Sequence, residues 1–168
     1  MRTKLISLGL ILLLIGCKTR QRDDSIKIDT IEKGKNSSES SVVYQPAGAI
    51  WVYDYNQLSE EFEIKQLRVV DKDTLTGEIL EKIINKTWPK VQVNFTSISN
   101  DTAFISIPES EVLTQQMGSA GAEGFMISTT FSFTELKGIN FVSFDFKEGD
   151  HGVPGVYNRN SWDKNKNQ

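Results

Sequence analysis

The sequence predicts a small α+β domain that begins at about Ala49, and three patterns lead to this prediction. Residues 50–55 alternate side chains with the period of a strand. Residues 75–88 instead place apolar side chains at helical spacing. Residues 91–95 and 103–107 alternate again and are separated by the turn-forming pair Asn100-Asp101, which predicts an antiparallel hairpin.

The first strand, 50–55, carries three aromatic rings on one face, from Trp51, Tyr53 and Tyr55. Such a face would suit a sugar or a protein partner, although aromatic strand faces are more commonly covered by a helix. A second extended segment is predicted over 62–70.

The helix is predicted over 75–88 and ends before Pro89. Asp73 or Thr74 is suited to cap its first turn, which Gly77 weakens by about 1 kcal/mol relative to alanine. The residues of its apolar stripe are Leu75, Ile79, Leu80, Ile83 and Ile84.

Residues 119–136 are compatible with two structures. A helical stripe would align Ala122, Phe125, Met126, Thr129, Phe133 and Leu136. Within the same segment, however, 127–134 alternates in the strand period, and Thr and Phe favour strands. The residues alone leave both structures open. A last strand is predicted over 139–146, and the end from 148 onward, which contains Gly and Pro, is expected to be irregular.

The N-terminus predicts a lipoprotein signal peptide over 1–16. Arg2 and Lys4 precede a twelve-residue apolar run, which is shorter than the ~20 residues that a membrane-spanning helix needs. The run ends in Gly16-Cys17, so the single Cys of the chain lies where a bacterial lipobox is cleaved and acylated. Two or three acyl chains, palmitate among them, would anchor Cys17 to a membrane almost irreversibly. The alternative is a buried or free Cys after an ordinary secretory signal.

Residues 17–48 are predicted to form the lipidated Cys and a flexible linker, because they hold too few apolar side chains to offset the entropy of ordering. A chain of this length spans ~30 Å. Lys18 favours the outer membrane over the inner one. The acidic pair Asp23-Asp24 is similar to the surface-export signals of Bacteroidota lipoproteins, with a simple charged linker as the alternative.

Composition restricts the partners and cofactors. The chain has 168 residues with 19 basic and 22 acidic side chains. Because the first sixteen residues contain two bases and no acid, the remaining 152 carry a net charge of −5, which disfavours nucleic acid. One Cys excludes an internal disulfide and a Cys-based zinc site, and one His excludes a His-rich metal site. We therefore predict no metal and no cofactor.

The order of these motifs resembles the GerMN domain of spore-germination, sporulation and envelope lipoproteins. The motifs are Val52-Tyr53-Asp54, the helix 75–88, Asn100–Ala103, Thr130–Leu136, Gly138-Ile139, Glu148-Gly149 and Arg159–Trp162. The chain departs from the family at Trp88-Pro89, where Gly-Pro is usual.

The resemblance implies a domain over 49–162 followed by a disordered tail, 163–168. It also implies that 119–136 is a helix, and hence that two helices pack on a mostly antiparallel sheet. The family has no shared catalytic residues. It implies a non-catalytic binding or assembly module, with an envelope protein or a glycan as partner.

Five residues are candidates for ligand binding: Gln115, Gln116, Ser119, His151 and Arg159. The first two precede a glycine-rich stretch that lacks the Lys-Ser/Thr of a phosphate loop, and they would line a pocket for a polar ligand.

The alternative function is an envelope hydrolase that uses His151 with Asp150, Ser119 or both. A triad requires a nucleophile and an acid on the two sides of the imidazole. The neighbouring side chains of Asp150 and His151 would point apart in an extended segment, so a loop that ties down backbone groups is the simpler interpretation.

Overall fold

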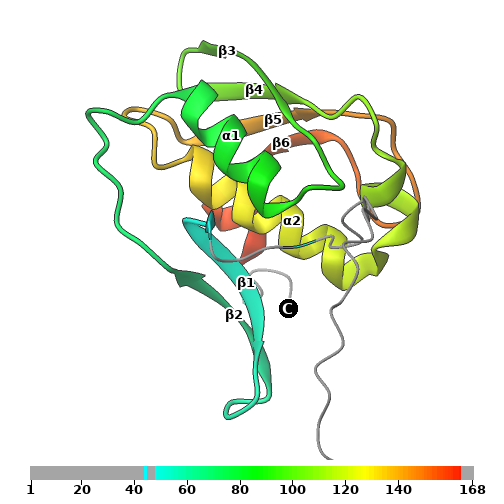
Figure 1. Cartoon of the computed structure of the whole chain (residues 1–168). Helices are drawn as coiled ribbons and strands as arrows, with labels where there is room; N and C mark the ends of the chain where they lie inside the picture. The colour runs from blue at the N-terminus through cyan, green and yellow to red at the C-terminus, as the bar shows by residue number, and fades with distance from the viewer. Residues whose placement is uncertain (1–43, 45–47, 164–168) are drawn as a thin grey trace, which may run out of the picture. The chain divides into compact units, whose positions relative to one another are not determined.

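The computed structural model describes Tyr44 and residues 48–163 (Figure 1). The predicted signal peptide, Gly16 and Cys17, most of the predicted linker and residues 164–168 lie outside the described residues. The predicted α+β fold is confirmed, with two sheets and two principal helices.

The described elements form three layers (Figure 1). A four-stranded sheet lies on one side, the helices lie beneath it, and a two-stranded hairpin packs against the far side of the second helix. The sheet has the order β3 (Asn94–Ser99), β4 (Thr102–Ser106), β5 (Phe141–Asp145), β6 (Gly155–Tyr157). The other elements are β1 (Trp51–Asn56), β2 (Glu61–Gln66), α1 (Gly77–Thr87), a π-helical turn η2 (Val112–Gln116), α2 (Gly118–Phe133) and a 3₁₀ turn η3 (Arg159–Trp162).

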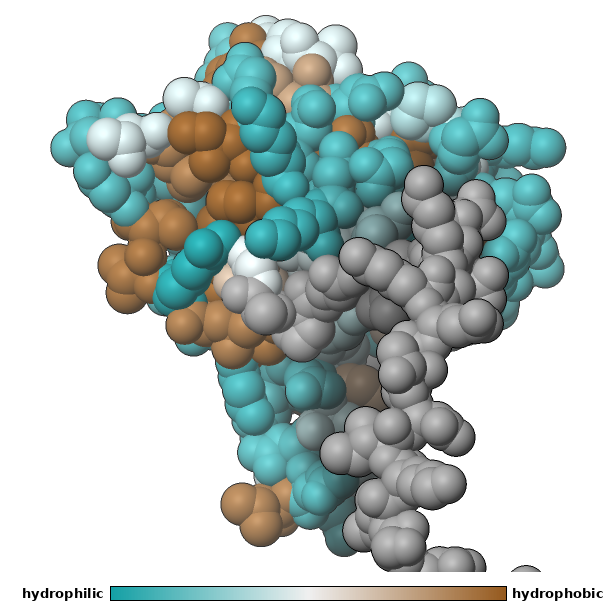
Figure 2. Space-filling model, viewed as in Figure 1, coloured by the Kyte–Doolittle hydropathy of each residue, from teal (hydrophilic) through white to brown (hydrophobic). Residues whose placement is uncertain are grey.

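The sheets are mostly antiparallel, as predicted. β1 pairs with β2, β3 with β4 and β5 with β6 in antiparallel register, whereas β4 and β5 are parallel. The parallel pair follows from the chain path, because η2 and α2 carry the chain back across the sheet between these two strands. The β1–β2 hairpin extends beyond the helices, and its far end carries a small hydrophobic surface (Figure 2).

The helix α2 is buried on two sides. It packs against β1 on one side and against the sheet and α1 on the other. Its buried residues are Ala122, Gly124, Phe125, Met126, Ile127, Ser128, Thr129, Thr130, Ser132 and Phe133. A helix enclosed in this way has buried residues on more than one face, so its sequence is not limited to a single apolar stripe. This explains why the residues alone also suited a strand.

The buried hydroxyls of α2 are satisfied within the helix itself. Thr130 Oγ1 donates to the Met126 carbonyl at 2.7 Å, and Ser132 Oγ donates to the Ser128 carbonyl at 2.6 Å. Thr129 is the exception, because its Oγ1 is fully buried and has no hydrogen-bond partner among the described residues.

The helix α1 is shorter than predicted, and the prediction of its cap was wrong. Thr76, not Asp73 or Thr74, caps it, with Thr76 Oγ1 accepting from the backbone of Ile79 at 3.3 Å. Gly77 does more than weaken the first turn. A Cβ at this position would lie 2.4 Å from the ring of Phe95, so glycine is what allows the helix to approach β3.

The apolar stripe of α1 is divided between the core and the surface. Leu80 and Ile84 are buried, whereas Ile79 is 41% exposed. Helix α1 therefore has an apolar outer face in addition to its core face.

The predicted hairpin at 91–107 is confirmed, and Asn100 occupies its turn with a φ of 54°. The pairing has a bulge between Phe95 and Ser97. The strand predicted over 62–70 ends at Gln66. The expectation of an irregular C-terminal end was wrong, because β6 pairs with β5 and Asn158 and Ser161 form a reciprocal cap on η3.

Two adjacent, fully buried threonines on α2 provide a matched test of this packing. Thr129→Val removes an unpaired hydroxyl and should stabilise the protein by about 1 kcal/mol, whereas Thr130→Val removes a bonded hydroxyl and should cost about 1 kcal/mol. Valine and threonine have similar helix propensities, so that contribution cancels. Urea unfolding would measure both free energies, and equal losses in the two variants would contradict the assignment of Thr129 as unpaired.

Candidate functional site

The N-terminus of α2 lies beside the loop that follows β5. Ser119 Oγ is 3.1 Å from His151 Nδ1, so the structure brings together two of the predicted site residues. The backbone N–H of His151 donates to the carbonyl of Thr114 at 3.1 Å, which holds the loop on η2. Gly149 permits this close approach, because a Cβ there would lie 2.4 Å from Gln115 Nε2.

The carboxylate of Asp150 is directed to Gln115. When the Gln115 side-chain amide is oriented with its nitrogen toward Asp150, this nitrogen donates to Asp150 Oδ2 at 3.1 Å. The amide oxygen then accepts from the Asp150 backbone N–H at 3.2 Å. Among the described residues, His151 makes no hydrogen bond to a carboxylate, and its Nδ1 contacts Ser119 instead. The arrangement is a Ser–His pair without the acid that would orient the imidazole.

A shallow cavity of about 290 Å³ lies next to Gln115. Neither Ser119 nor His151 lines it. The cavity is mainly polar, and its residues are Pro108, Glu109, Ser110, Glu111, Thr114, Gln115, Lys147 and Glu148. Gln116 lies outside it and donates to Glu111 Oε1 at 3.3 Å on the surface. Of the two predicted glutamines, only Gln115 therefore lines a cavity.

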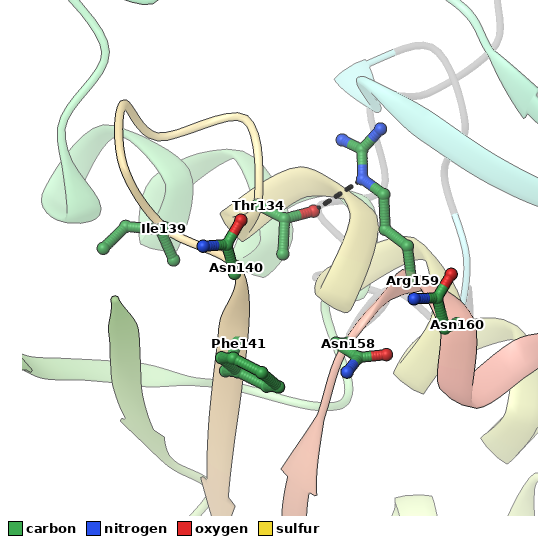
Figure 3. A pocket seen from close by; sticks show the side chains of 7 residues that line it. All are labelled: Thr134, Ile139, Asn140, Phe141, Asn158, Arg159 and Asn160. Carbon is green, nitrogen blue, oxygen red and sulfur yellow. Dashed lines mark hydrogen bonds between the residues drawn. The ribbon is translucent and has the colours of Figure 1, made fainter. Parts of the chain in front are cut away.

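Arg159 lies at the other end of α2. A sixteen-residue helix is ~24 Å long, so Arg159, which bonds to Thr134 just after α2, is well separated from Ser119. It lines a cavity of about 360 Å³ together with Thr134, Ile139, Asn140, Phe141, Asn158 and Asn160 (Figure 3). The guanidinium points away from this space, toward β1, and its Nε donates to Thr134 Oγ1 at 2.8 Å. The three asparagine amides therefore supply most of the polar lining.

The charge of Arg159 is neutralised inside the fold by Glu135. This carboxylate is 5% exposed and accepts from Arg159 at 2.5 Å, from the Trp51 indole at 3.1 Å and from Lys72 at 2.9 Å. The guanidinium also lies 4.9 Å from the ring centroids of both Trp51 and Phe131. Arg159, predicted as a ligand-binding residue, thus joins α2, β1 and η3.

The role of Glu135 could not be predicted from the sequence, because its partners come from segments far apart in the chain. Burial raises the pKa of its carboxyl, but the hydrogen bonds and charges of Lys72 and Arg159 outweigh burial, so the pKa lies below its ordinary value.

The tip of the β1–β2 hairpin presents one apolar side chain on an ordered turn. Leu58 is 97% exposed. Asn56 Nδ2 and Ser59 Oγ both donate to Glu63 Oε1 at 2.7 Å, and Asn56 Oδ1 accepts from the Leu58 backbone at 2.9 Å. Sequence analysis also missed this feature, although a leucine within a turn-forming stretch was a visible signal.

The aromatic face of β1 is largely covered. Trp51 packs on Phe131 of α2, and Tyr53 stacks on Phe62 of β2 with ring centroids 5.1 Å apart in both pairs. Tyr55, near the tip, stays 48% exposed. The predicted aromatic platform is therefore reduced to its outer end.

Comparison with known protein families and with solved structures found no match for this chain. The resemblance to the GerMN domain therefore stays a prediction. Within residues 48–163, no helix has the length and apolar character that crossing a membrane requires. In the same part of the chain, no group of three or more His, Cys, Asp or Glu side chains is placed to hold a metal ion.

The Glu135 cluster predicts an acid-sensitive contribution to stability. Because the folded-state pKa is lowered, the carboxylate stabilises the fold above its unfolded pKa of about 4.3, and this contribution is lost as the pH falls through the folded value. Glu135→Gln should lower the free energy of unfolding at pH 7 by about 1–2 kcal/mol, because the charge-assisted hydrogen bonds from Arg159 and Lys72 are lost while both cations keep access to solvent.

Urea unfolding between pH 3 and pH 7 would test this expectation. The variant should show a weaker pH dependence than the unmodified chain, and Glu109→Gln, which changes an exposed carboxylate, should not. An unchanged pH dependence in Glu135→Gln would show that the cluster does not couple protonation to folding.

Proposed function

We propose that this chain is a lipid-anchored protein of the bacterial cell envelope, whose folded domain is a non-catalytic binding or assembly module. The lipobox-like sequence at Gly16-Cys17 supports the anchor, and Lys18 supports the outer membrane. The resemblance to the GerMN domain supports the class of module. The observation that carries the proposal is the ordered hairpin tip with Leu58 fully exposed.

An exposed leucine on a flexible loop would mean little, since single apolar residues are common on protein surfaces. Leu58 differs because the hydrogen bonds of Asn56 and Ser59 to Glu63 fix the turn that carries it. A side chain held in place loses little conformational freedom on binding, so most of its apolar burial contributes to affinity. The tip therefore suits insertion into a pocket of a partner protein.

A membrane anchor at Cys17 is compatible with binding through the hairpin tip. The linker predicted from the sequence, if it is a flexible chain of about thirty residues, would span ~30 Å and hold the domain clear of the lipid headgroups, so that the hairpin could reach a neighbouring envelope protein.

The contact between Ser119 and His151 favours a second candidate, an envelope hydrolase. A distance of 3.1 Å is within the range of a nucleophile and its general base. Two features count against the hydrolase. The Asp150 carboxylate is bonded to Gln115, and Ser119 is exposed outside the cavities described above.

Labelling with a fluorophosphonate probe would distinguish the two candidates. For a binding module, we expect Ser119 to react no faster than other surface serines, because the Asp150 carboxylate is bonded to Gln115 and Ser119 lines none of the cavities described above. Peptide mass spectrometry would locate the adducts. Rapid labelling of Ser119 that is lost in His151→Ala would overturn the non-catalytic assignment.

Photo-crosslinking tests the binding function directly. With Leu58 replaced by a photo-crosslinking amino acid in the full chain, irradiation of intact cells should join position 58 to a partner, identified by mass spectrometry. The matched control is Val153, an exposed apolar residue on another loop, from which we expect no crosslink. Absence of any product from position 58 would contradict the proposal.

Cys17→Ser should move the protein from the membrane to the soluble fraction.

A further inference from the structure

We propose that the hairpin tip docks into a basic-rimmed apolar pocket at α1 of a second copy of this chain, so that copies associate head to tail. The inference rests on the proposed binding function and names its partner. It is carried by two surfaces that match in shape, polarity and charge and that cannot meet within one molecule.

The first surface, which we call the plug, is Leu58 with the acidic residues around it. The turn 56–61 contains Glu60 and Glu61 and no basic residue. The nearest lysine along the strand, Lys65, is already paired with Glu63 at 3.0 Å. The plug is therefore a leucine surrounded by negative charge.

The second surface, which we call the socket, is a pocket of about 280 Å³ on the outer face of α1. Ile79 and Ile83 supply its apolar part, and its rim is formed by Gly48, Arg68, Lys82 and Lys86. The four α1 side chains are spaced at i, i+3, i+4 and i+7, which places them on one face of the helix. No acidic side chain lines the socket. Figure 2 shows hydrophobic surface in this region beside strongly hydrophilic side chains.

The two acidic residues of α1 closest to the socket are engaged elsewhere. Glu81 turns toward the sheet and accepts from the backbone N–H of Phe95 at 2.7 Å. Glu78 bonds at the start of the helix, to Thr76 and to its own backbone N–H. The charge of Glu78 also acts on Lys82. The positive charge that the rim offers an acidic partner therefore comes mainly from Arg68 and Lys86.

Plug and socket lie at opposite ends of the same hairpin. Gly48 precedes β1 and Arg68 follows β2, and the Arg68 guanidinium donates to the Gly48 carbonyl, so this pair marks the base. Six strand residues at ~3.3 Å each separate the base from the tip, a distance of ~20 Å. A plug therefore cannot enter its own socket, and a contact between two copies uses a different surface from each.

The charges favour a copy of this chain over a lipid surface as the occupant. Anionic headgroups would repel the acidic plug, whereas the socket offers three cations around an apolar pocket that exceeds a leucine side chain in volume. A contact made by one side chain and its charged neighbours is weak and transient, since interfaces below about 1,200 Å² are typically of this kind.

The experiment uses two differently tagged full-length copies that are expressed together in cells. One copy carries the photo-crosslinker at position 58. We expect a product that contains both tags, with the crosslinked peptide of the second copy spanning Lys82 and Ile83. Reversing Lys82 and Lys86 to Glu in the second copy should reduce the yield about tenfold, because like charges then face each other. The same reversal confined to the crosslinker copy should leave the yield unchanged.

A charge swap guards against loss of folding in the socket variant. Changing Glu60 and Glu61 to Lys in the crosslinker copy should restore the yield with the Lys82→Glu, Lys86→Glu partner. Reversing Lys137, an exposed lysine outside the socket, is the matched control and should have no effect.

A product with another protein alone would overturn this inference and retain the proposed binding function. No product from position 58 would overturn both, and a two-tag product that is insensitive to the reversal would overturn the socket.

Discussion

The helix α2 has almost no side that faces solvent, and the positions of the surrounding elements follow from this constraint. Ten of its sixteen residues are buried between the four-stranded sheet and the β1–β2 hairpin. Buried polar groups of such a helix need internal partners, and the hydroxyls of Thr130 and Ser132 find them in carbonyls of α2 itself, whereas that of Thr129 does not. The layer that covers α2 is in turn attached by the Glu135 cluster, which joins the helix end to β1 and η3.

Because α2 fills the space between the two sheets, the cavities and the polar candidate residues lie around the outside of the fold. The cavities lie at the two ends of α2 and beside α1, and the groups that attract attention as catalytic residues, Ser119 and His151, lie on the surface. The hairpin then serves two purposes with one element: its base covers α2, and its tip extends beyond the helices (Figure 1). The proposed binding role rests on this division.

The periodic parts of the fold could be predicted from the sequence, whereas the parts fixed by long-range contacts could not. The strand at 50–55, the hairpin around Asn100 and the existence of α1 followed from local patterns. The helix at 119–136 needed the family resemblance, because burial on two sides made its pattern fit a strand as well as a helix. The contact between Ser119 and His151 was foreseen as an alternative. Glu135 was not, because its partners Trp51, Lys72 and Arg159 are dispersed over more than a hundred residues.

The two outer strands of the four-stranded sheet have a consequence for how the protein behaves when crowded. β6 is only three residues long, and the bulge between Phe95 and Ser97 interrupts the regular pairing of β3. Neither edge therefore offers a long, flat row of free backbone groups on which a foreign strand could extend the sheet. At this sheet, molecules packed side by side on a surface would meet through side chains and not through a growing backbone ladder of the kind that seeds amyloid.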